Sequence, residues 1–454
     1  MTLRFLHFSD IHFGQEDRLG AWEVHNDVRA EVLADCRRVI ADGLLEKRVD
    51  AILVTGDIAQ QGLEAEFKQA VEWLDQVTEV VGCPRTSVHV IPGNHDVDLT
   101  LMGKTAKTVQ DQIRALATSE IPAFMKDLSK DSDNPLLRKF TDYRAFAEAY
   151  GSDFHSTGRP VAIHSHALDE NRSLRFVGLC SVLVCDKDDN VGNMVLGPSQ
   201  YVIPREQQVE DVYMMHHPLS WYKDCAEITP YINSRARVLL TGHEHAPALK
   251  KIVYDDGWEQ LHIAAGALNP PRQSTGYTFS YSWIEFSHGF EEGSEVINVT
   301  VYPRIWTSST RFGPDREKTG GENSVRIQLK VSPPKAVATA SAVGARLENP
   351  IPVQYEHEEE VAMPTNEPLP NRVLDQEAFD TLRFLFWRYF ERKTRQQVLV
   401  NLGLLLPSTR VLPEAYEKQA FELAAAENKL GVLWDAIMPA VPPDERRPNP
   451  FTAK

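Results

Sequence analysis

The sequence predicts an α/β domain followed by a small all-helical domain. Short apolar runs alternate with helical patterns near the start of the chain, and strand-like runs dominate its middle. An apolar pattern at helical spacing returns after a stretch rich in proline, alanine and glutamate. The length of 454 residues fits two domains, or one large domain with an appendage.

The first part of the chain alternates between strand and helix. Short apolar runs that end at small or acidic residues predict strands at residues 3–9 and 50–55, and an alternating pattern predicts one at residues 87–92. Helical patterns lie between them, at about residues 24–46 and 64–80. This alternation is typical of an α/β domain with layered sheets. Residues 99–150 are also helical in pattern, and we interpret them as a cap over the site that the loops form.

The second half of the α/β domain is predicted to be mainly strand. The runs lie at residues 174–184, 211–215, 236–241, 259–264, 278–286 and 295–305. Residues 331–371 are rich in proline, alanine and glutamate and have no apolar periodicity, so we interpret them as a linker. The α/β domain is therefore expected to span residues 1–330.

The C-terminal region is predicted to be a helical domain over residues 372–441. Its first helix carries apolar residues at helical spacing: Phe379, Leu382, Phe386 and Tyr389. A second helix is expected at about 413–430, with Pro413 near its start and Gly431 as its stop, followed by a short helix in VLWDAIM. Residues 442–454 are expected to form a flexible tail.

The charge and cysteine content narrow the class of protein. The net charge of −16 disfavours binding to nucleic acid by bulk attraction. The five cysteines are odd in number and have no CxxC spacing, which fits reduced, buried thiols. No apolar stretch is long enough to span a membrane, and the first residues turn polar too soon for a signal peptide. We therefore expect a cytoplasmic protein.

Five polar motifs follow strand-like runs, and strands of one sheet edge could bring them together. They are Asp10-Ile11-His12, Gly56-Asp57, Gly93-Asn94-His95-Asp96, His216-His217-Pro218 and Gly242-His243-Glu244-His245. Each motif alone is common in proteins. Together they favour a metal site, because buried carboxylates and imidazoles need partners that offset their desolvation. Oxygen and nitrogen ligands without thiolate suit Mn²⁺, Fe or Zn²⁺.

The order and completeness of these motifs resemble the calcineurin-like metallophosphoesterases. The resemblance extends over residues 1–330 and implies a four-layer α/β/β/α sandwich that binds two divalent metal ions. It implies that Asp57 bridges the two ions and that the other ligands fall into two sets. The first set is Asp10, His12 and His245, and the second is Asn94, His216 and His243.

The resemblance also implies the chemistry of the site. A hydroxide that bridges the ions would attack the phosphorus, and the developing charge would be neutralised by the metals. His95 would face the substrate and donate a proton or hydrogen bond, with Asp96 orienting it. We prefer His216 to His217 as the ligand because His216 stands two residues before the proline.

The motifs leave the substrate open. HHP and GNHD resemble enzymes that cleave cyclic nucleotides, whereas SDIHFG and GHEH also resemble Mre11-type nucleases. We favour a metal-dependent phosphodiesterase acting on a nucleotide diester, because a polymeric substrate needs a basic track and the first 330 residues are acidic. A DNA or RNA nuclease is the alternative. A non-catalytic scaffold on the same fold is disfavoured because no expected ligand has been lost.

The C-terminal domain resembles the effector-associated, death-like adaptor domains of bacterial defence proteins. This resemblance implies that residues 372–441 recruit a partner protein or self-associate, and that they regulate or deliver the enzyme. The long linker predicts that this domain is separable from catalysis. The alternative is a helical appendage that packs on the α/β domain or forms a dimer.

Overall fold

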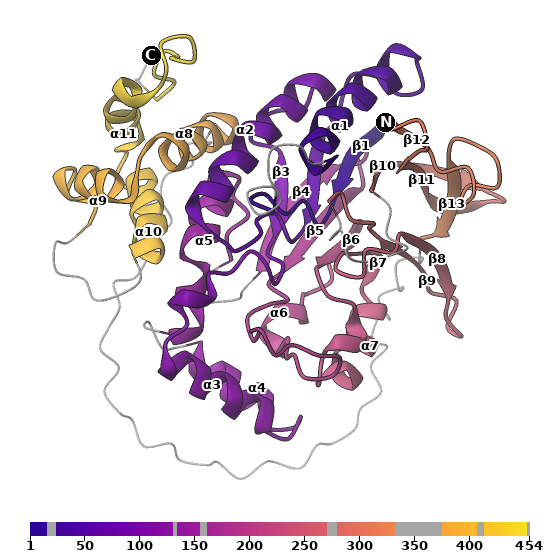
Figure 1. Ribbon diagram of the computed structural model, residues 1–454, viewed down its shortest axis with the longest axis horizontal. Coiled ribbons are helices and arrows are strands. Elements are labelled where there is room, and N and C mark those ends of the chain that lie inside the picture. Colours follow the sequence, from indigo (N-terminus) through magenta and orange to yellow (C-terminus); the bar gives the residue numbers. More distant parts are fainter. Residues whose placement is uncertain are drawn as a thin grey trace, which may run out of the picture.

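The computed structural model describes residues 1–15, 24–129, 134–154, 161–269, 279–331, 375–405 and 413–451. The predicted linker lies outside these ranges except for Val331. Two β-sheets form the centre of the molecule, with helices around them (Figure 1).

The first sheet has seven strands in the order β12-β11-β10-β1-β2-β3, with β13 also paired to β11. Its parallel part consists of β1 (Thr2–Phe8), β2 (Ala51–Thr55) and β3 (Val88–Ile91). Its antiparallel part consists of β10 (Ser280–Glu291), β11 (Ser294–Trp306), β12 (Phe312–Pro314) and β13 (Val325–Lys330). β1 joins the two parts, because it pairs in parallel with β2 and antiparallel with β10.

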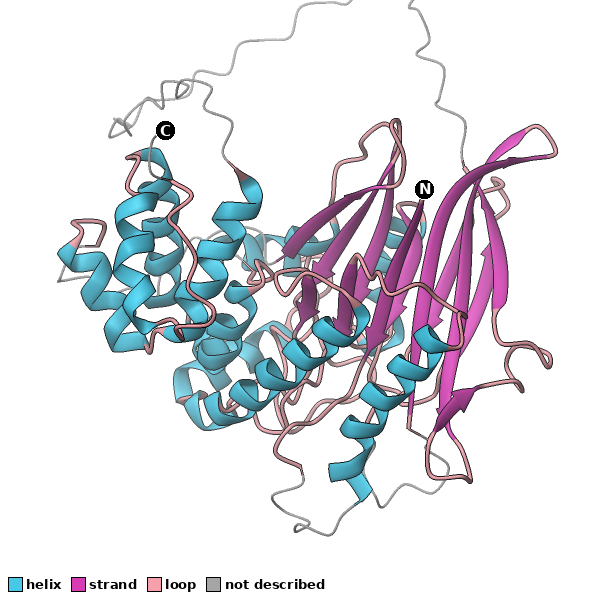
Figure 2. Ribbon diagram, turned by 90° about the horizontal axis from the view of Figure 1, so that it is seen from above, coloured by secondary structure: helices cyan, strands magenta, loops and turns pink. Residues whose placement is uncertain are grey.

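The second sheet has six strands in the order β4-β5-β6-β7-β9-β8. They are β4 (Val161–Ala167), β5 (Ser173–Leu179), β6 (Val209–Met215), β7 (Ala236–Thr241), β8 (Ala248–Val253) and β9 (Glu259–Ala264). The sheets lie side by side in Figure 2, and their facing side chains form one apolar core in which Phe5 contacts Phe176 and Phe286. Strands buried in this way read as apolar runs, which is why most of them were predictable.

Helices α1 (Val24–Ala41) and α2 (Glu64–Val81) cover the first sheet, where Trp73 packs on Phe8 with ring centroids 5.2 Å apart. Helix α7 (Cys225–Asn233) lies against β7, and the short α6 (Pro198–Tyr201) lies against α7. The predicted fold class, an α/β sandwich of two sheets with a small helical C-terminal domain, is confirmed.

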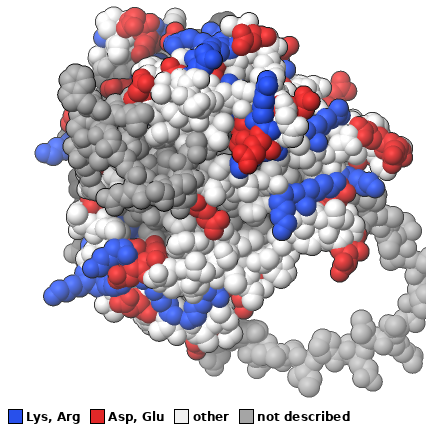
Figure 3. All heavy atoms as spheres, turned by 45° about the vertical axis from the view of Figure 1, so that its right-hand side comes forward, with Lys and Arg blue, Asp and Glu red and all other residues white. Residues whose placement is uncertain are grey.

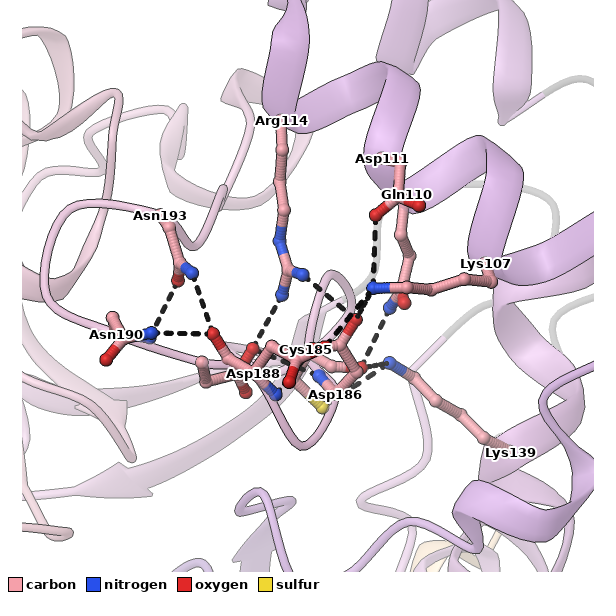
Figure 4. A network of polar contacts seen from close by, with 11 residues as sticks. Lys107, Gln110, Asp111, Arg114, Lys139, Cys185, Asp186, Asp188, Asn190 and Asn193 are labelled. Atoms are coloured by element: carbon pink, nitrogen blue, oxygen red, sulfur yellow. Dashed lines mark hydrogen bonds and ion pairs between the residues drawn. The ribbon is translucent and has the colours of Figure 1, made fainter.

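The segment predicted as a helical cap is indeed helical. It contains η2 (Leu99–Leu101), α3 (Lys104–Ala115), α4 (Ile121–Leu128), η3 (Pro135–Phe140) and α5 (Thr141–Ala149). Figure 4 shows how α3 is anchored to the loop after β5. Lys107 and Arg114 both pair with Asp186, at 2.7 and 2.9 Å, and Arg114 also pairs with Asp189 at 2.6 Å. Lys223 Nζ donates to the Arg114 carbonyl, which links the cap to the segment that follows His217.

The C-terminal domain contains, in its described residues, one α-helix more than predicted, at Arg392–Asn401, and a short 3₁₀ helix. Its elements are α8 (Gln376–Tyr389), α9 (Arg392–Asn401), α10 (Pro413–Ala426), α11 (Leu430–Ile437) and η5 (Met438–Ala440). Gly431 lies inside α11 and does not end the preceding helix, because the chain already turns at Asn428 with a positive φ of 56°. The expected flexible tail is wrong for residues 442–451: Glu445 accepts a hydrogen bond from Tyr389 at 2.6 Å and pairs with Arg85 at 2.9 Å.

This helical domain packs on the α/β domain, which was the alternative to a separable unit. Figure 1 shows α8 beside α2 and α5. Phe384 lies with its ring centroid 5.8 Å from that of Tyr150. Arg388 pairs with Asp75 of α2, and Lys418 pairs with Glu148 of α5 at 3.4 Å.

None of the helices in the described ranges is long and apolar enough to cross a membrane.

Candidate metal centre

The predicted site residues follow the carboxyl ends of strands in both sheets. Asp10, Asp57 and Asn94 follow the parallel strands β1, β2 and β3, and His216 and His243 follow β6 and β7. Backbone hydrogen bonds join the loops to one another: the Asp10 amide donates to the Gly56 carbonyl at 3.0 Å, and the Gly242 amide donates to the His216 carbonyl at 2.9 Å. The stacked sheets therefore bring the five motifs to one place.

Glycines in two of the motifs allow this close approach. A Cβ atom on Gly93 would lie 2.2 Å from Asp57 Oδ1, and one on Gly56 would lie 2.6 Å from His216 Nδ1. Gly56 also has a φ of 91°, which other residues rarely adopt. Substitution at either position would push the carboxylate or the imidazole out of the site.

Five of the predicted metal-site residues have left-handed backbone conformations. Their φ values are 54° at Asp10, 52° at His12, 53° at Asp57, 67° at His243 and 54° at His245. Such strain costs on the order of 1–3 kcal/mol per residue and is typical of functional sites, where the surrounding structure enforces it. The loops are thus shaped to aim these side chains inward at the expense of local stability.

The first group of candidate ligands is Asp10, His12 and His245, whose ligand atoms lie within 4.8 Å of one another. His245 Nε2 is 3.0 Å from Asp10 Oδ1. Both ring nitrogens of His12 are buried and have no hydrogen-bond partner among the described residues. Burial lowers the pKa of His12 to about 4, so its imidazole is neutral and can donate a lone pair to a cation.

The second group of candidate ligands is Asn94, His216 and His243. His216 Nε2 is 3.2 Å from Asn94 Oδ1, and His216 Nδ1 donates to the Thr55 carbonyl at 2.7 Å, which fixes the ring. Burial opposes a charge on His216, but Asp57 raises its pKa to about 9. Burial lowers the pKa of His243 to about 4. A cation bound here would take the place of the proton that His216 carries.

Asp57 lies between the two groups. Its Oδ2 atom is 3.9 Å from His12 Nε2 and 3.3 Å from His216 Nε2, and its Oδ1 atom accepts from the His95 amide at 2.8 Å. Burial opposes ionisation of this carboxyl, yet His216 and His95 hold its pKa well below the usual value. An ionised carboxylate in this position can bridge two cations. The donor set, the unpartnered His12 nitrogens and the position of Asp57 all fit a pair of divalent metal ions.

His95 lies at the edge of the site. The prediction that Asp96 orients it differs from the contacts that both residues make. Its Nδ1 donates to the backbone carbonyl of Gln60 at 2.9 Å. Asp96, expected to orient His95, instead accepts from the Ala59 amide at 2.7 Å and the Gly93 amide at 2.8 Å, so it holds two loops together. The pKa of Asp96 is raised well above the usual value by burial and by Asp57.

Two residues that contact the predicted site residues, Gln60 and Trp221, were not predicted from the sequence. Gln60 follows Asp57 by three residues on the same loop, and that proximity was the only sign of its role. Trp221 lies with its ring centroid 4.3 Å from that of His243 and 5.1 Å from that of His217. A tryptophan three residues after the HHP motif gives no sequence signal that separates a site residue from a core residue.

Comparison with known proteins agrees with this geometry. A family model described as calcineurin-like phosphoesterase matches residues 3–247, and one described as GTPase-associated adaptor domain matches residues 378–439. An uncharacterized metallophosphoesterase-like protein of Bacillus subtilis, YydB, is 24% identical over 332 residues, which cover 69% of this chain and 63% of that protein. The DNA double-strand break repair protein Mre11 of Archaeoglobus fulgidus is 30% identical over 98 residues, which cover 21% of this chain and 19% of that protein.

The chain thus spans less than two thirds of the length of these curated relatives. Among solved structures, the sulfate thiohydrolase SoxB of Thermus thermophilus matches with a TM-score of 0.33 and 11% identity, covering 70% of this chain and 59% of that one. The family model covers more than half of the chain and includes all five motifs. The chain therefore belongs to the calcineurin-like phosphoesterase family and carries an adaptor domain in its C-terminal region.

Proposed function

We propose that this protein is a phosphodiesterase that uses two divalent metal ions, Mn²⁺, Fe or Zn²⁺, and hydrolyses a nucleotide-type diester. The position of Asp57 carries the proposal, because a single carboxylate oxygen lies between the first and second groups of ligands. Asp10, His12 and His245 hold one ion, and Asn94, His216 and His243 hold the other. The ions would lower the pKa of coordinated water and neutralise charge that develops on the phosphate.

The carboxylates and His95 have distinct roles in the proposed reaction. Asp10 and Asp57 stay ionised despite burial, so the site attracts cations before the substrate arrives. The Gln60 carbonyl accepts from Nδ1 of His95 and so orients the ring. When the ring is an imidazolium, its Nε2 would give a proton to the leaving-group oxygen and the neutral Nδ1–H form would remain. Asp96 keeps the two loops that carry Asp57 and His95 in register.

The charge of the chain supports a small substrate over a nucleic acid. The net charge is −16, and lysine and arginine are interspersed with aspartate and glutamate on the described part of the face in Figure 3. A polymer would need a basic track to hold several phosphates. The match to Mre11 keeps a nuclease as the second candidate.

We assign catalysis to residues 1–330 and protein interaction to residues 372–441. The match to an adaptor model supports the second assignment. The adaptor domain would recruit or regulate the enzyme through a partner protein, in a bacterial defence system, while it remains packed on α2 and α5.

A substrate panel tests the proposed activity. The metal-free protein is supplied with Mn²⁺, Fe²⁺ or Zn²⁺ and assayed on cyclic mononucleotides, dinucleotides, single-stranded DNA, a chromogenic diester and the matching monoester. We expect metal-dependent hydrolysis, faster on the diester than on the monoester and abolished by a chelator. Preferential cleavage of DNA would favour the nuclease, and absence of metal binding and of ester hydrolysis would refute the proposal.

A second prediction concerns His95. Replacing His95 by asparagine should keep both metal ions and lower kcat by about 10²–10⁴-fold, the usual contribution of a general acid. The loss should be greatest for substrates with poor leaving groups, because these depend most on protonation. Metal content and a leaving-group series measure the two effects. His12, Asp57 and His95 also have ligand atoms within 4.8 Å of one another, so loss of a metal in this variant would identify His95 as a ligand.

A further inference from the structure

His217 is completely buried, and nothing in its surroundings satisfies it. Its relative exposure is 0%, and neither ring nitrogen has a hydrogen-bond partner among the described residues. Leaving a buried polar group unpaired costs on the order of 1–3 kcal/mol, so such groups require an explanation. His12, the expected ligand of the first metal, is the other site histidine in this condition.

The position of His217 supplies that explanation. A ligand nitrogen from each of His216, His217 and His243 lies within 4.8 Å of the other two. The ring centroid of His217 is 4.1 Å from that of His243 and 4.9 Å from that of His216. Imidazole nitrogens that share a zinc ion each lie roughly 2.0–2.1 Å from it, so three nitrogens this close together are candidates for binding one cation.

We propose that His217 supplies a third imidazole to the metal position of His216 and His243. This inference rests on the proposed two-metal function and deepens it. A role in packing alone does not account for the residue, because leucine would fill similar space without burying two unpaired nitrogens.

The consequence is that the two metal positions differ in chemistry. Beside the shared carboxylate of Asp57, the first position has the carboxylate of Asp10 and two imidazoles, whereas the second has three imidazoles and the amide of Asn94. Imidazole suits Zn²⁺ and Fe, while carboxylate oxygen suits Mn²⁺. The second position therefore prefers Zn²⁺ or Fe²⁺, and the first accepts Mn²⁺.

Metal titration of the full chain tests this inference without an activity assay. The metal-free wild type, His217→Leu and His217→Gln are titrated calorimetrically with Zn²⁺ and with Mn²⁺, and their thermal unfolding is followed with and without Zn²⁺. His288→Gln is the matched control, because His288 is a partly buried histidine on β10 that bonds Asp169.

We expect both His217 variants to lose at least about tenfold in Zn²⁺ affinity at one of two equivalents, together with part of the rise in Tm that Zn²⁺ produces. Mn²⁺ binding at the first position and the Tm of the metal-free His217→Leu variant should not fall. Wild-type Zn²⁺ affinity at both equivalents, or a lower Tm in the metal-free variants with an unchanged response to Zn²⁺, would overturn the inference. A different result would contradict the proposed function and not the role of His217: a wild type that binds two metal ions but hydrolyses no diester.

Discussion

Replacing Asp57 by asparagine should lower turnover on a diester by roughly a thousandfold and weaken the binding of both metal ions. The carboxylate lies between the two ligand groups, so its loss removes an anionic ligand from both positions at once. Loss of several kcal/mol of transition-state stabilisation corresponds to this factor, since each 1.36 kcal/mol is tenfold in rate. Steady-state kinetics and metal analysis of the purified variant measure the two effects.

The fold should survive this substitution. Asparagine has nearly the shape of aspartate, and it tolerates the φ of 53° that the position demands. Its amide oxygen can still accept the hydrogen bond from the His95 amide. Asp98→Asn is the matched control, because Asp98 is a buried carboxylate near the site that caps η2 and belongs to neither ligand group. An Asp57→Asn variant with two tightly bound metals and wild-type turnover would contradict the bridging role.

Much of the site could be predicted because its candidate ligands lie in short sequence motifs that directly follow strands. The strands at 236–241 and 259–264 have the predicted bounds, since each is a compact run buried between layers. Parallel strands end at the same edge, so polar residues just beyond them converge. Asp10, Asp57 and Asn94 converge in this way in the first sheet, whereas Asp57 and His216 follow strands of different sheets and meet only because the two sheets stack.

The predictions that failed concern strands and contacts that leave no clear pattern in the sequence. β4 and β8 were missed because both lie at sheet edges, where His164, His166, Lys250 and Lys251 interrupt the apolar pattern. The partner of His95 is a backbone carbonyl, which every residue possesses, so its position cannot be inferred from side-chain types. Asp96 stands next to His95 in sequence, yet its carboxylate faces the amides of two loops.

The packing of the helical domain on the α/β domain could not be predicted from the sequence either. An amphipathic helix such as α8 presents the same pattern whether its apolar face meets its own chain or a partner. The deciding contacts are long-range, as in the ion pairs of Arg85 with Glu445 and of Arg388 with Asp75. A partner protein could therefore bind only the part of the helical domain that does not face α2 and α5. The apolar area available for such binding is smaller than the sequence pattern of α8 suggests.

The interface between the two domains should contribute substantially to stability. Phe384 is 3% exposed, contacts Tyr150, and lies beneath the guanidinium groups of Arg85 and Arg388, whose centres are 5.4 and 5.3 Å from its ring. Truncating a buried phenylalanine to alanine costs about 3–5 kcal/mol, because apolar contacts are lost and a cavity remains. Phe384→Ala should therefore lower the free energy of unfolding by about 3 kcal/mol or more.

The same variant should separate domain packing from catalysis. Calorimetry is expected to resolve an early transition of the helical domain, while kcat on a small chromogenic diester stays near the wild-type value, since the metal-site residues all lie at strand ends outside α8. Leu423→Ala is the matched control, because Leu423 is 40% exposed on α10 and its truncation should change stability by no more than about 0.5 kcal/mol. If Phe384→Ala unfolds like Leu423→Ala, the interface contributes little and the helical domain is held only by its linker; if kcat falls with stability, the packing of α8 on α5 supports the active site through the cap.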